Sequence, residues 1–136
     1  MSHLNGLPDL FLDRSLGRLQ VAASLRQAGL RLVTLSEHYG IPADEKVEDS
    51  TWLEAAGSAG WVVLMKDRRI RWNRVEQDAV MTHNVKAFCL TRQDLLATEM
   101  AARFLDNLPA ITRACSKPGP FIYAVHTTRI ERLRIT

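Results

Sequence analysis

Short apolar runs alternate along the chain with stretches in which apolar residues recur every three or four positions. The clearest run is 61–65, Trp-Val-Val-Leu-Met, which is typical of a strand buried on both faces of a parallel sheet. The clearest helical stripe lies in 94–108, where Leu96, Met100 and Phe104 recur every four residues on one face. The pattern predicts strands at 9–12, 31–35, 61–65, 87–90 and 121–126, and helices at 16–28, 49–60, 73–82 and 94–108.

Polar and glycine residues set the expected ends of these elements. Asp49 or Ser50 is the expected N-cap of the second helix, which Gly60 ends. Thr91 or Asp94 is the expected cap of the longest helix. A loop that contains a glycine and a proline is expected between the second strand and the second helix.

Strands that alternate with helices imply an α/β fold, a three-layer sandwich with a mostly parallel central sheet. Residues 129–135 add a hairpin partner to the last strand. No repeat, low-complexity tract or linker divides the sequence, so residues 1–136 are expected to form a single domain. Since crossovers between parallel strands are right-handed, the strands 9–12 and 61–65 should end at the same edge of the sheet.

Aspartates stand where these strands and the second helix meet that edge. Asp13 follows the first strand, Asp67 follows the central strand, and Asp49 opens the preceding helix. Carboxylates gathered in this way repel one another unless a positive charge lies between them, and a hard divalent cation such as Mg²⁺ or Mn²⁺ is the natural candidate. The pattern therefore predicts a small metal-dependent enzyme of phosphoryl chemistry.

The charge distribution indicates a polyanionic substrate. The net charge is +3, with acidic residues concentrated in 44–54. Basic side chains around an acidic pocket suit a polyanion, although ordinary solvated surface charge is the simpler interpretation of any single arginine. The basic residues that follow the central strand are Lys66, Arg68, Arg69, Arg71 and Arg74, and Arg129, Arg132 and Arg134 lie near the end of the chain.

Several classes of protein are excluded by the sequence. Its apolar runs are far shorter than the roughly 20 residues of a membrane span, so a cytoplasmic protein without a membrane partner is expected. Cys89 and Cys115 lack metal-site spacing and are expected to be small apolar residues, buried or half-buried. The histidines share no spacing, and no phosphate-binding loop or serine-nucleophile motif is present.

Three segments with carboxylates occur in a fixed order. Asp13-Arg14 follows the first strand, 49–55 reads Asp-x-x-Trp-Leu-x-Ala, and 60–70 reads Gly-Trp-Val-Val-Leu-Met-Lys-Asp-x-Arg-Ile. Together with matches at 85–90, 99–104 and 119–122, the chain resembles the PIN-like nucleases, and most closely their short VapC-type toxin branch. The resemblance covers nearly the whole sequence.

This resemblance implies a Mg²⁺- or Mn²⁺-dependent endoribonuclease that leaves a 5′-phosphate and a 3′-hydroxyl. Members of the branch are usually toxins held inactive by a cognate antitoxin, so a homo-oligomer or a toxin–antitoxin hetero-oligomer is expected. Carried over by position, Asp13, Asp49 and Asp67 are the implied catalytic and metal-binding carboxylates. A further acid is usual between the second strand and Asp49. The candidates are Glu37, Asp44, Glu45 and Glu48, with Glu37 as the expected additional metal ligand and a solvated loop acid as the equal alternative.

Basic side chains near these carboxylates are the candidate RNA contacts. Arg14 and Lys66 adjoin the strand aspartates and could touch phosphate or simply balance charge. Trp72 lies among basic residues, where it could stack on a base or serve in packing. The expected RNA-binding residues are Arg14, Lys66, Arg68, Arg69 and Arg71, although those after Asp67 could instead meet an acidic antitoxin segment.

A second hypothesis, from a different class, is a catalytically weak or inactive PIN-like module that binds RNA or a protein partner. The two differ in metal-dependent cleavage, which substitution of Asp13 or Asp67 by asparagine should abolish only in the enzyme. A receiver-like domain also has acidic strand ends, but its acidic pair lies at the first strand and the present pattern does not match it.

Overall fold

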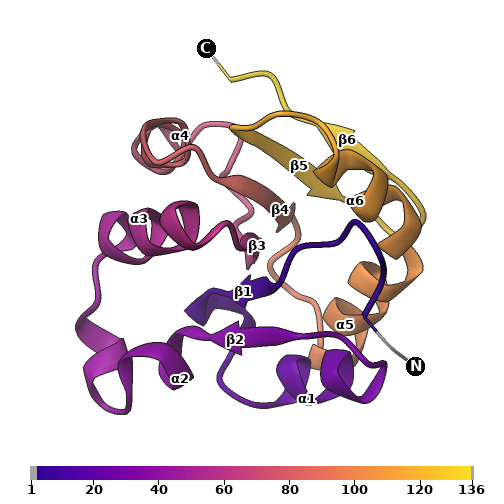
Figure 1. The fold of residues 1–136 in the computed structure, drawn as a ribbon, viewed down its shortest axis with the longest axis horizontal. Helices are drawn as coiled ribbons and strands as arrows, with labels where there is room; N and C mark the ends of the chain where they lie inside the picture. Colours follow the sequence, from indigo (N-terminus) through magenta and orange to yellow (C-terminus); the bar gives the residue numbers. More distant parts are fainter. Residues whose placement is uncertain (1–2, 136) are drawn as a thin grey trace.

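The computed structural model describes residues 3–135 and contains a six-stranded sheet between two layers of helices (Figure 1). The strand order is β2-β1-β3-β4-β5-β6; the first five strands run parallel, and β6 runs antiparallel to β5. The predicted hairpin partner of the last parallel strand is thus confirmed. The strands are β1 (Leu10–Leu12), β2 (Leu32–Thr34), β3 (Val62–Lys66), β4 (Lys86–Leu90), β5 (Phe121–Val125) and β6 (Ile130–Arg132).

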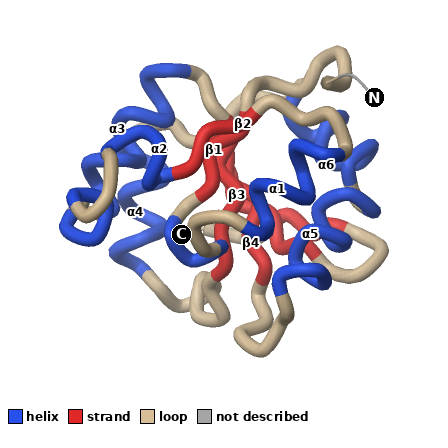
Figure 2. The backbone as a smooth tube through the Cα atoms, turned by 90° about the horizontal axis from the view of Figure 1, so that it is seen from below, coloured by secondary structure: helices blue, strands red, loops and turns tan. Residues whose placement is uncertain are grey.

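The helices divide between the two faces of the sheet, as Figure 2 shows in a view along its edge. One layer contains α2 (Leu35–Tyr39), α3 (Asp49–Ala59) and α4 (Arg74–Thr82), and the other contains α1 (Gln20–Gln27), α5 (Ala97–Asp106) and α6 (Leu108–Cys115). Two short 3-10 turns lie at Arg14–Leu16 and Ala43–Lys46. The predicted fold class, a three-layer α/β sandwich with a mostly parallel sheet, is confirmed.

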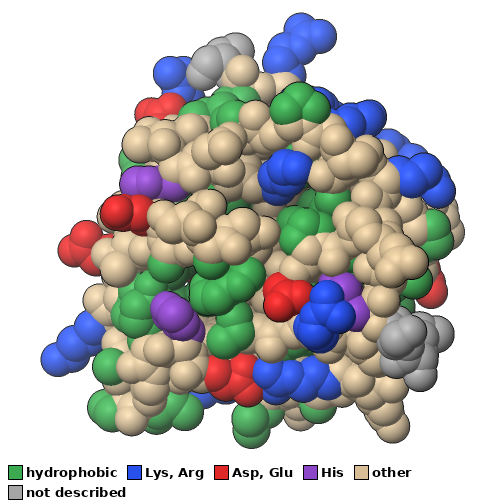
Figure 3. Space-filling model, viewed as in Figure 1, with side chains coloured by type: hydrophobic (Ala, Val, Ile, Leu, Met, Phe, Trp, Pro, Cys, Tyr) green, Lys and Arg blue, Asp and Glu red, His purple; other side chains and the backbone are tan. Residues whose placement is uncertain are grey.

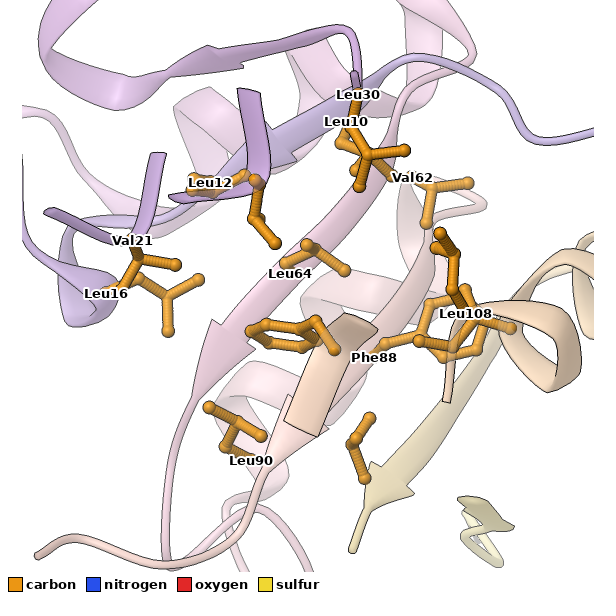
Figure 4. Close-up of a cluster of buried hydrophobic side chains, with 14 of the residues drawn as sticks. Leu10, Leu12, Leu16, Val21, Leu30, Val62, Leu64, Phe88, Leu90 and Leu108 are labelled. Carbon is orange, nitrogen blue, oxygen red and sulfur yellow. The ribbon is translucent and has the colours of Figure 1, made fainter. Parts of the chain in front are cut away.

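The core has two halves because successive side chains of a strand point to opposite faces. In β1, Leu10 and Leu12 join the cluster under α1, α5 and α6, which Figure 4 shows around Leu64 and Phe88. Phe11, between the two leucines, joins the opposite cluster and stacks on Trp52 of α3. Both clusters consist of buried side chains, so β1, β3 and β4 are fixed from both sides.

Two parts of the fold differ from the prediction. The expected helix 94–108 is two helices, because Asn107 interrupts it and Pro109 begins a new first turn in α6. The first of these begins at Ala97, where the backbone N–H of Leu96 donates to Glu99 at 2.8 Å, so Thr91 and Asp94 are not the cap. The expected loop after β2 contains α2 and a 3-10 turn, started by a capping box between Thr34 and Glu37.

The expectations for the two cysteines and for membrane-spanning segments can also be compared with the structure. Cys89 and Cys115 are both buried and free, as predicted. Within residues 3–135, no helix is both long and apolar enough to cross a membrane.

Candidate functional site

The order of the strands identifies where the site should lie. The chain runs outward from β1 in two directions, to β2 on one side and to β3 on the other, so β1 and β3 flank the point at which strand order reverses. Ligands of open parallel sheets bind at the carboxyl ends of the strands beside this point. Asp13 and Asp67 are the residues that follow β1 and β3 there, which confirms their predicted position at one sheet edge.

Backbone hydrogen bonds extend the ladder as far as both aspartates. The N–H of Asp13 donates to the carbonyl of Leu64 at 3.1 Å, and the N–H of Asp67 donates to the carbonyl of Leu90 at 2.9 Å. Both residues therefore start from rigid strand ends. Precision of this kind is what a metal or catalytic site requires of its supporting elements.

Ser15 joins the ends of β1 and β3. Its hydroxyl donates to Oδ2 of Asp13 at 2.8 Å and accepts the backbone N–H of Lys66 at 2.9 Å. One side chain therefore orients the first aspartate and fixes the last residue of the neighbouring strand. This role was not predicted from the sequence.

Asn73 joins Asp67 to α4 in a similar way. Its Nδ2 donates to Oδ2 of Asp67 at 3.0 Å, and its Oδ1 caps α4 by accepting the N–H of Glu76 at 3.1 Å. The other carboxylate oxygen of Asp67 accepts the N–H of Arg69 at 2.8 Å. The first turn of α4, with Glu76 in it, is thereby held beside the end of β3.

Glu76 is the acidic residue of the site that the sequence analysis missed. It is 6% exposed, although glutamate is almost never buried without a partner. Burial, the charges of Asp49, Asp13 and Asp67, and a hydrogen bond shared with Asp49 raise the pKa of Glu76 to about 8. The four carboxylates thus act on one another, with Glu76 holding a proton against Asp49 near neutral pH.

Asp13 occupies the most enclosed position of the group. It is 7% exposed, and burial, with a further contribution from the charge of Asp49, raises its pKa despite the hydrogen bond from Ser15. Its Oδ1 is fully buried and has no hydrogen-bond partner. An unpaired buried carboxylate oxygen is costly, and such groups in a native structure need an explanation.

Asp49 reaches the group from α3, but not as the predicted cap. Glu48 is the N-cap, without a side-chain capping bond, so neither Asp49 nor Ser50 has that role. Oδ1 of Asp49 instead accepts the indole N–H of Trp52 at 3.0 Å. The fully buried Trp52 thus anchors the carboxylate at the first turn of α3.

The donor set consists of carboxylates alone, which is the preference of a hard divalent cation. Among residues 3–135, no three His, Cys, Asp or Glu side chains lie close enough together to form a finished metal centre as they stand. The unpaired Oδ1 of Asp13 and the proton retained by Glu76 both indicate excess negative charge at this edge. In donor chemistry and in charge, the group fits a divalent cation.

Three of the four acids proposed between β2 and Asp49 are engaged elsewhere, and the fourth, Glu48, is exposed. Both carboxylate oxygens of Glu37 bind Arg26, at 2.6 and 2.8 Å, and the pKa of Glu37 is lowered mainly by this hydrogen bonding to Arg26. Asp44 binds Arg18 through two hydrogen bonds of 3.0 Å, and Glu45 binds the same arginine. The structure therefore brings Glu76, from the far side of Asp67, to the carboxylates instead of Glu37.

The predicted RNA-contacting residues fall into two groups. Arg14 donates to the backbone carbonyls of Asp44 and Val47 and so ties down the segment that leads to Asp49, while Arg71 pairs with Glu131 at 2.9 Å. Lys66 is half-buried, and Arg68 and Arg69 are exposed beside the carboxylates. In the view of Figure 3, basic side chains are spread over the surface with acidic ones between them.

The comparisons with known proteins agree with this architecture. Residues 8–92, which contain all four carboxylates, match the family described as "PIN like domain". The chain belongs to the PIN-like family. It is 45% identical over 130 residues to the curated protein "Putative ribonuclease VapC45" of Mycobacterium tuberculosis, an alignment that covers 96% of this chain and 94% of that protein. This supports the predicted VapC-type branch of the PIN-like family, while no solved structure gives a significant match.

Proposed function

We propose that this protein is a metal-dependent endoribonuclease that hydrolyses RNA phosphodiesters, with Asp13, Asp49, Asp67 and Glu76 as its acidic residues. The observation that carries the proposal is the convergence of these carboxylates at the strand-order reversal, where Asp13 has an unpaired oxygen and Glu76 a raised pKa. Membership of the PIN-like family and similarity to a protein named as a ribonuclease supply the reaction class.

The carboxylates would hold Mg²⁺ or Mn²⁺, drawn closer together than they lie in this structure. When bound, such an ion offsets negative charge on the phosphate oxygens and makes water a stronger nucleophile. Asp13 and Asp67 are the primary candidates as ligands because they start from rigid strand ends. Asp49 and Glu76 face them from α3 and α4, and Glu76 must release its proton before it can bind a cation. The expected products are a 5′-phosphate and a 3′-hydroxyl.

The test is cleavage of a pool of structured and single-stranded RNAs by the purified chain with Mn²⁺, with Mg²⁺ or with EDTA. Asp67→Asn keeps the size of the side chain and removes its charge, so cleavage should fall at least about a hundredfold, since several kcal/mol of charge stabilisation are lost. Asp9→Asn is the matched control, because Asp9 lies at the opposite end of β1 and is exposed.

Cleavage that needs metal and vanishes only in Asp67→Asn supports the enzyme. Absence of cleavage under every metal, by a folded protein free of partners, contradicts it and favours the non-catalytic module that binds RNA or a protein.

We also propose that the protein is the toxin of a toxin–antitoxin pair and acts in the cytoplasm on RNA. The support is its similarity over nearly full length to a VapC-named relative. Expression of the wild-type chain alone should arrest growth of a bacterial host, and Asp67→Asn should not. Equal growth of both strains at equal protein levels would contradict the toxin assignment.

A further inference from the structure

Trp72 is the most exposed tryptophan of the protein and lies on the segment that joins Asp67 to α4. It is 75% exposed, whereas Trp52 is fully buried and Trp61 is half-buried. The sequence left open whether Trp72 stacks on a base or serves in packing, and this exposure argues against packing. Singly exposed apolar side chains are common on protein surfaces, so the exposure of Trp72 shows that its ring is free to contact a ligand, and the neighbouring residues must show which ligand fits.

The segment that carries Trp72 is well anchored. The N–H of Trp72 donates to the carbonyl of Arg69 at 2.8 Å, and the N–H of Arg69 in turn donates to Oδ1 of Asp67. Ile70 is fully buried, and its carbonyl accepts Nε2 of Gln77 at 2.6 Å. The backbone of Trp72 is therefore fixed relative to Asp67, which reduces the entropy cost of using its side chain in binding.

The charge of the same segment favours a nucleic acid over a protein partner. Arg68, Arg69 and Arg74 of the same segment are exposed, while Arg71 is paired with Glu131. Binders of single-stranded nucleic acid combine a basic track with an aromatic stacking surface, and this segment starts at Asp67 of the proposed catalytic group. An exposed indole on a segment that also carries three exposed arginines has this combination.

We propose that Trp72 is the stacking surface for an unpaired base next to the scissile phosphate, with Arg68, Arg69 and Arg74 on the flanking backbone. This inference rests on the proposed ribonuclease function and deepens it, because it assigns a residue of this chain to contact with an unpaired base of the substrate. Inside a duplex, neighbouring base pairs cover both faces of every base, so only a terminal pair could offer a face to Trp72.

The experiment measures binding in EDTA, so that it does not depend on cleavage. Wild type, Trp72→Ala, Trp72→Phe and Val75→Ala are titrated with an unstructured RNA oligonucleotide and with a blunt RNA duplex of the same length. Stacking predicts that Trp72→Ala weakens binding of the single strand roughly tenfold, and that of the duplex much less. Trp72→Phe retains an aromatic face and should stay close to wild type. Val75→Ala, which removes a side chain that is 81% exposed, is the matched control.

Tryptophan fluorescence supplies a second, direct measurement. Since Trp52 and Trp61 are shielded, the single strand should quench the emission of wild type by an amount that disappears in Trp72→Ala. Unchanged affinity and unchanged quenching in Trp72→Ala would overturn the proposal, as would equal losses for single strand and duplex, or failure of the wild type to bind RNA. A Trp72 effect in a protein that never cleaves RNA would uphold stacking and reject only the enzyme.

Discussion

Glu76 shows how a single residue can decide the behaviour of the whole acidic group. In the native state it stays protonated up to about pH 8, whereas in the unfolded chain it ionises near the ordinary value of 4.5. The native state therefore binds the extra proton between these two values. The stabilisation that this proton gives the native state is complete below about pH 4.5 and is lost as the pH rises toward 8.

We predict that the free energy of unfolding of the EDTA-treated protein falls by on the order of a few kcal/mol between about pH 5 and 8. Glu76→Gln should remove much of this dependence, because glutamine has no proton to lose. A residual slope should remain, since the pKa of Asp13 is also raised. Urea denaturation at several pH values measures the pH dependence of the free energy of unfolding. Glu54→Gln, on the exposed side of α3, is the control. Parallel pH profiles for wild type and Glu76→Gln would contradict the prediction.

Ser15 gives a second prediction at the residue scale. Ser15→Ala removes the hydrogen bond to Asp13 and leaves the N–H of Lys66 without its acceptor, so about 1–3 kcal/mol of stability should be lost. Cleavage should fall as well, because Asp13 loses its orienting partner. Ser24→Ala, at another half-buried serine, should change both measurements little. Full activity of Ser15→Ala would show that Asp13 needs no such support.

The acidic residues differ in how far the sequence reveals them. Asp13 and Asp67 follow apolar strands, and strand ends meet at a sheet edge by topology alone. Glu76 lies on a helix, where its burial depends on how α4 packs against α3, and this is not visible in a local pattern. The available signal was an acid in the first turn of the helix that Asn73 opens, shortly after Asp67. The search between β2 and Asp49 instead favoured Glu37, whose role is to cap α2 and bind Arg26.

At the scale of elements, α3 and α4 must pack closely to bring Asp49 and Glu76 together. Gly57 makes this approach feasible: a Cβ atom built there would lie 2.1 Å from the carbonyl oxygen of His83, at the end of α4. That oxygen belongs to the backbone, so the steric clash can be relieved only by moving one helix relative to the other. Spacing of apolar residues predicts that both helices exist, but not that a glycine sets their separation.

We therefore predict that Gly57→Ala costs roughly 1–3 kcal/mol of stability, as is typical of overpacking, even though alanine is the better helix former. The matched control is Ser58→Ala, at the exposed neighbouring position of α3, which should be nearly neutral. Chemical denaturation of the two variants measures the difference. The raised pKa of Glu76 should also decrease in Gly57→Ala because Asp49 moves away. Equal free energies of unfolding for the two variants would show that α3 and α4 can move apart without loss of stability.

The break between α5 and α6 was accessible to sequence reasoning only in part. Pro109 cannot continue a helix but is favoured in a first turn, so it indicated a boundary near this position. The boundary at Asn107 depends on tertiary contacts, since its Nδ2 donates to the carbonyls of Arg103 and His126, the latter beyond β5. The apolar stripe of 94–108 continued across the break and concealed it.

For the whole molecule, binding of a divalent cation should raise the free energy of unfolding, because the ion binds the folded state. We predict that Mn²⁺ at a hundredfold excess over its Kd stabilises the fold by roughly 2.7 kcal/mol, which corresponds to a Tm increase of several degrees. The increase should be larger near pH 8 than near pH 6, because Glu76 must lose its proton to take part. Differential scanning calorimetry on wild type and on Asp13→Asn measures it, and an equal shift in both would place the ion elsewhere.

The pairing of β1 with β3 also bears on when this protein becomes functional during its synthesis. The strands are adjacent in the sheet, yet α1, β2, α2 and α3 lie between them in the chain. Contacts between segments so distant in sequence form late, after their connection has been ordered. A nascent fragment that ends before Glu76 carries at most Asp13, Asp49 and Asp67, and so lacks the complete acidic group. The proposed ribonuclease activity thus arises only after β1, β2, β3 and the first turn of α4 have left the ribosome, which delays any attack on the RNA of the machinery that makes it.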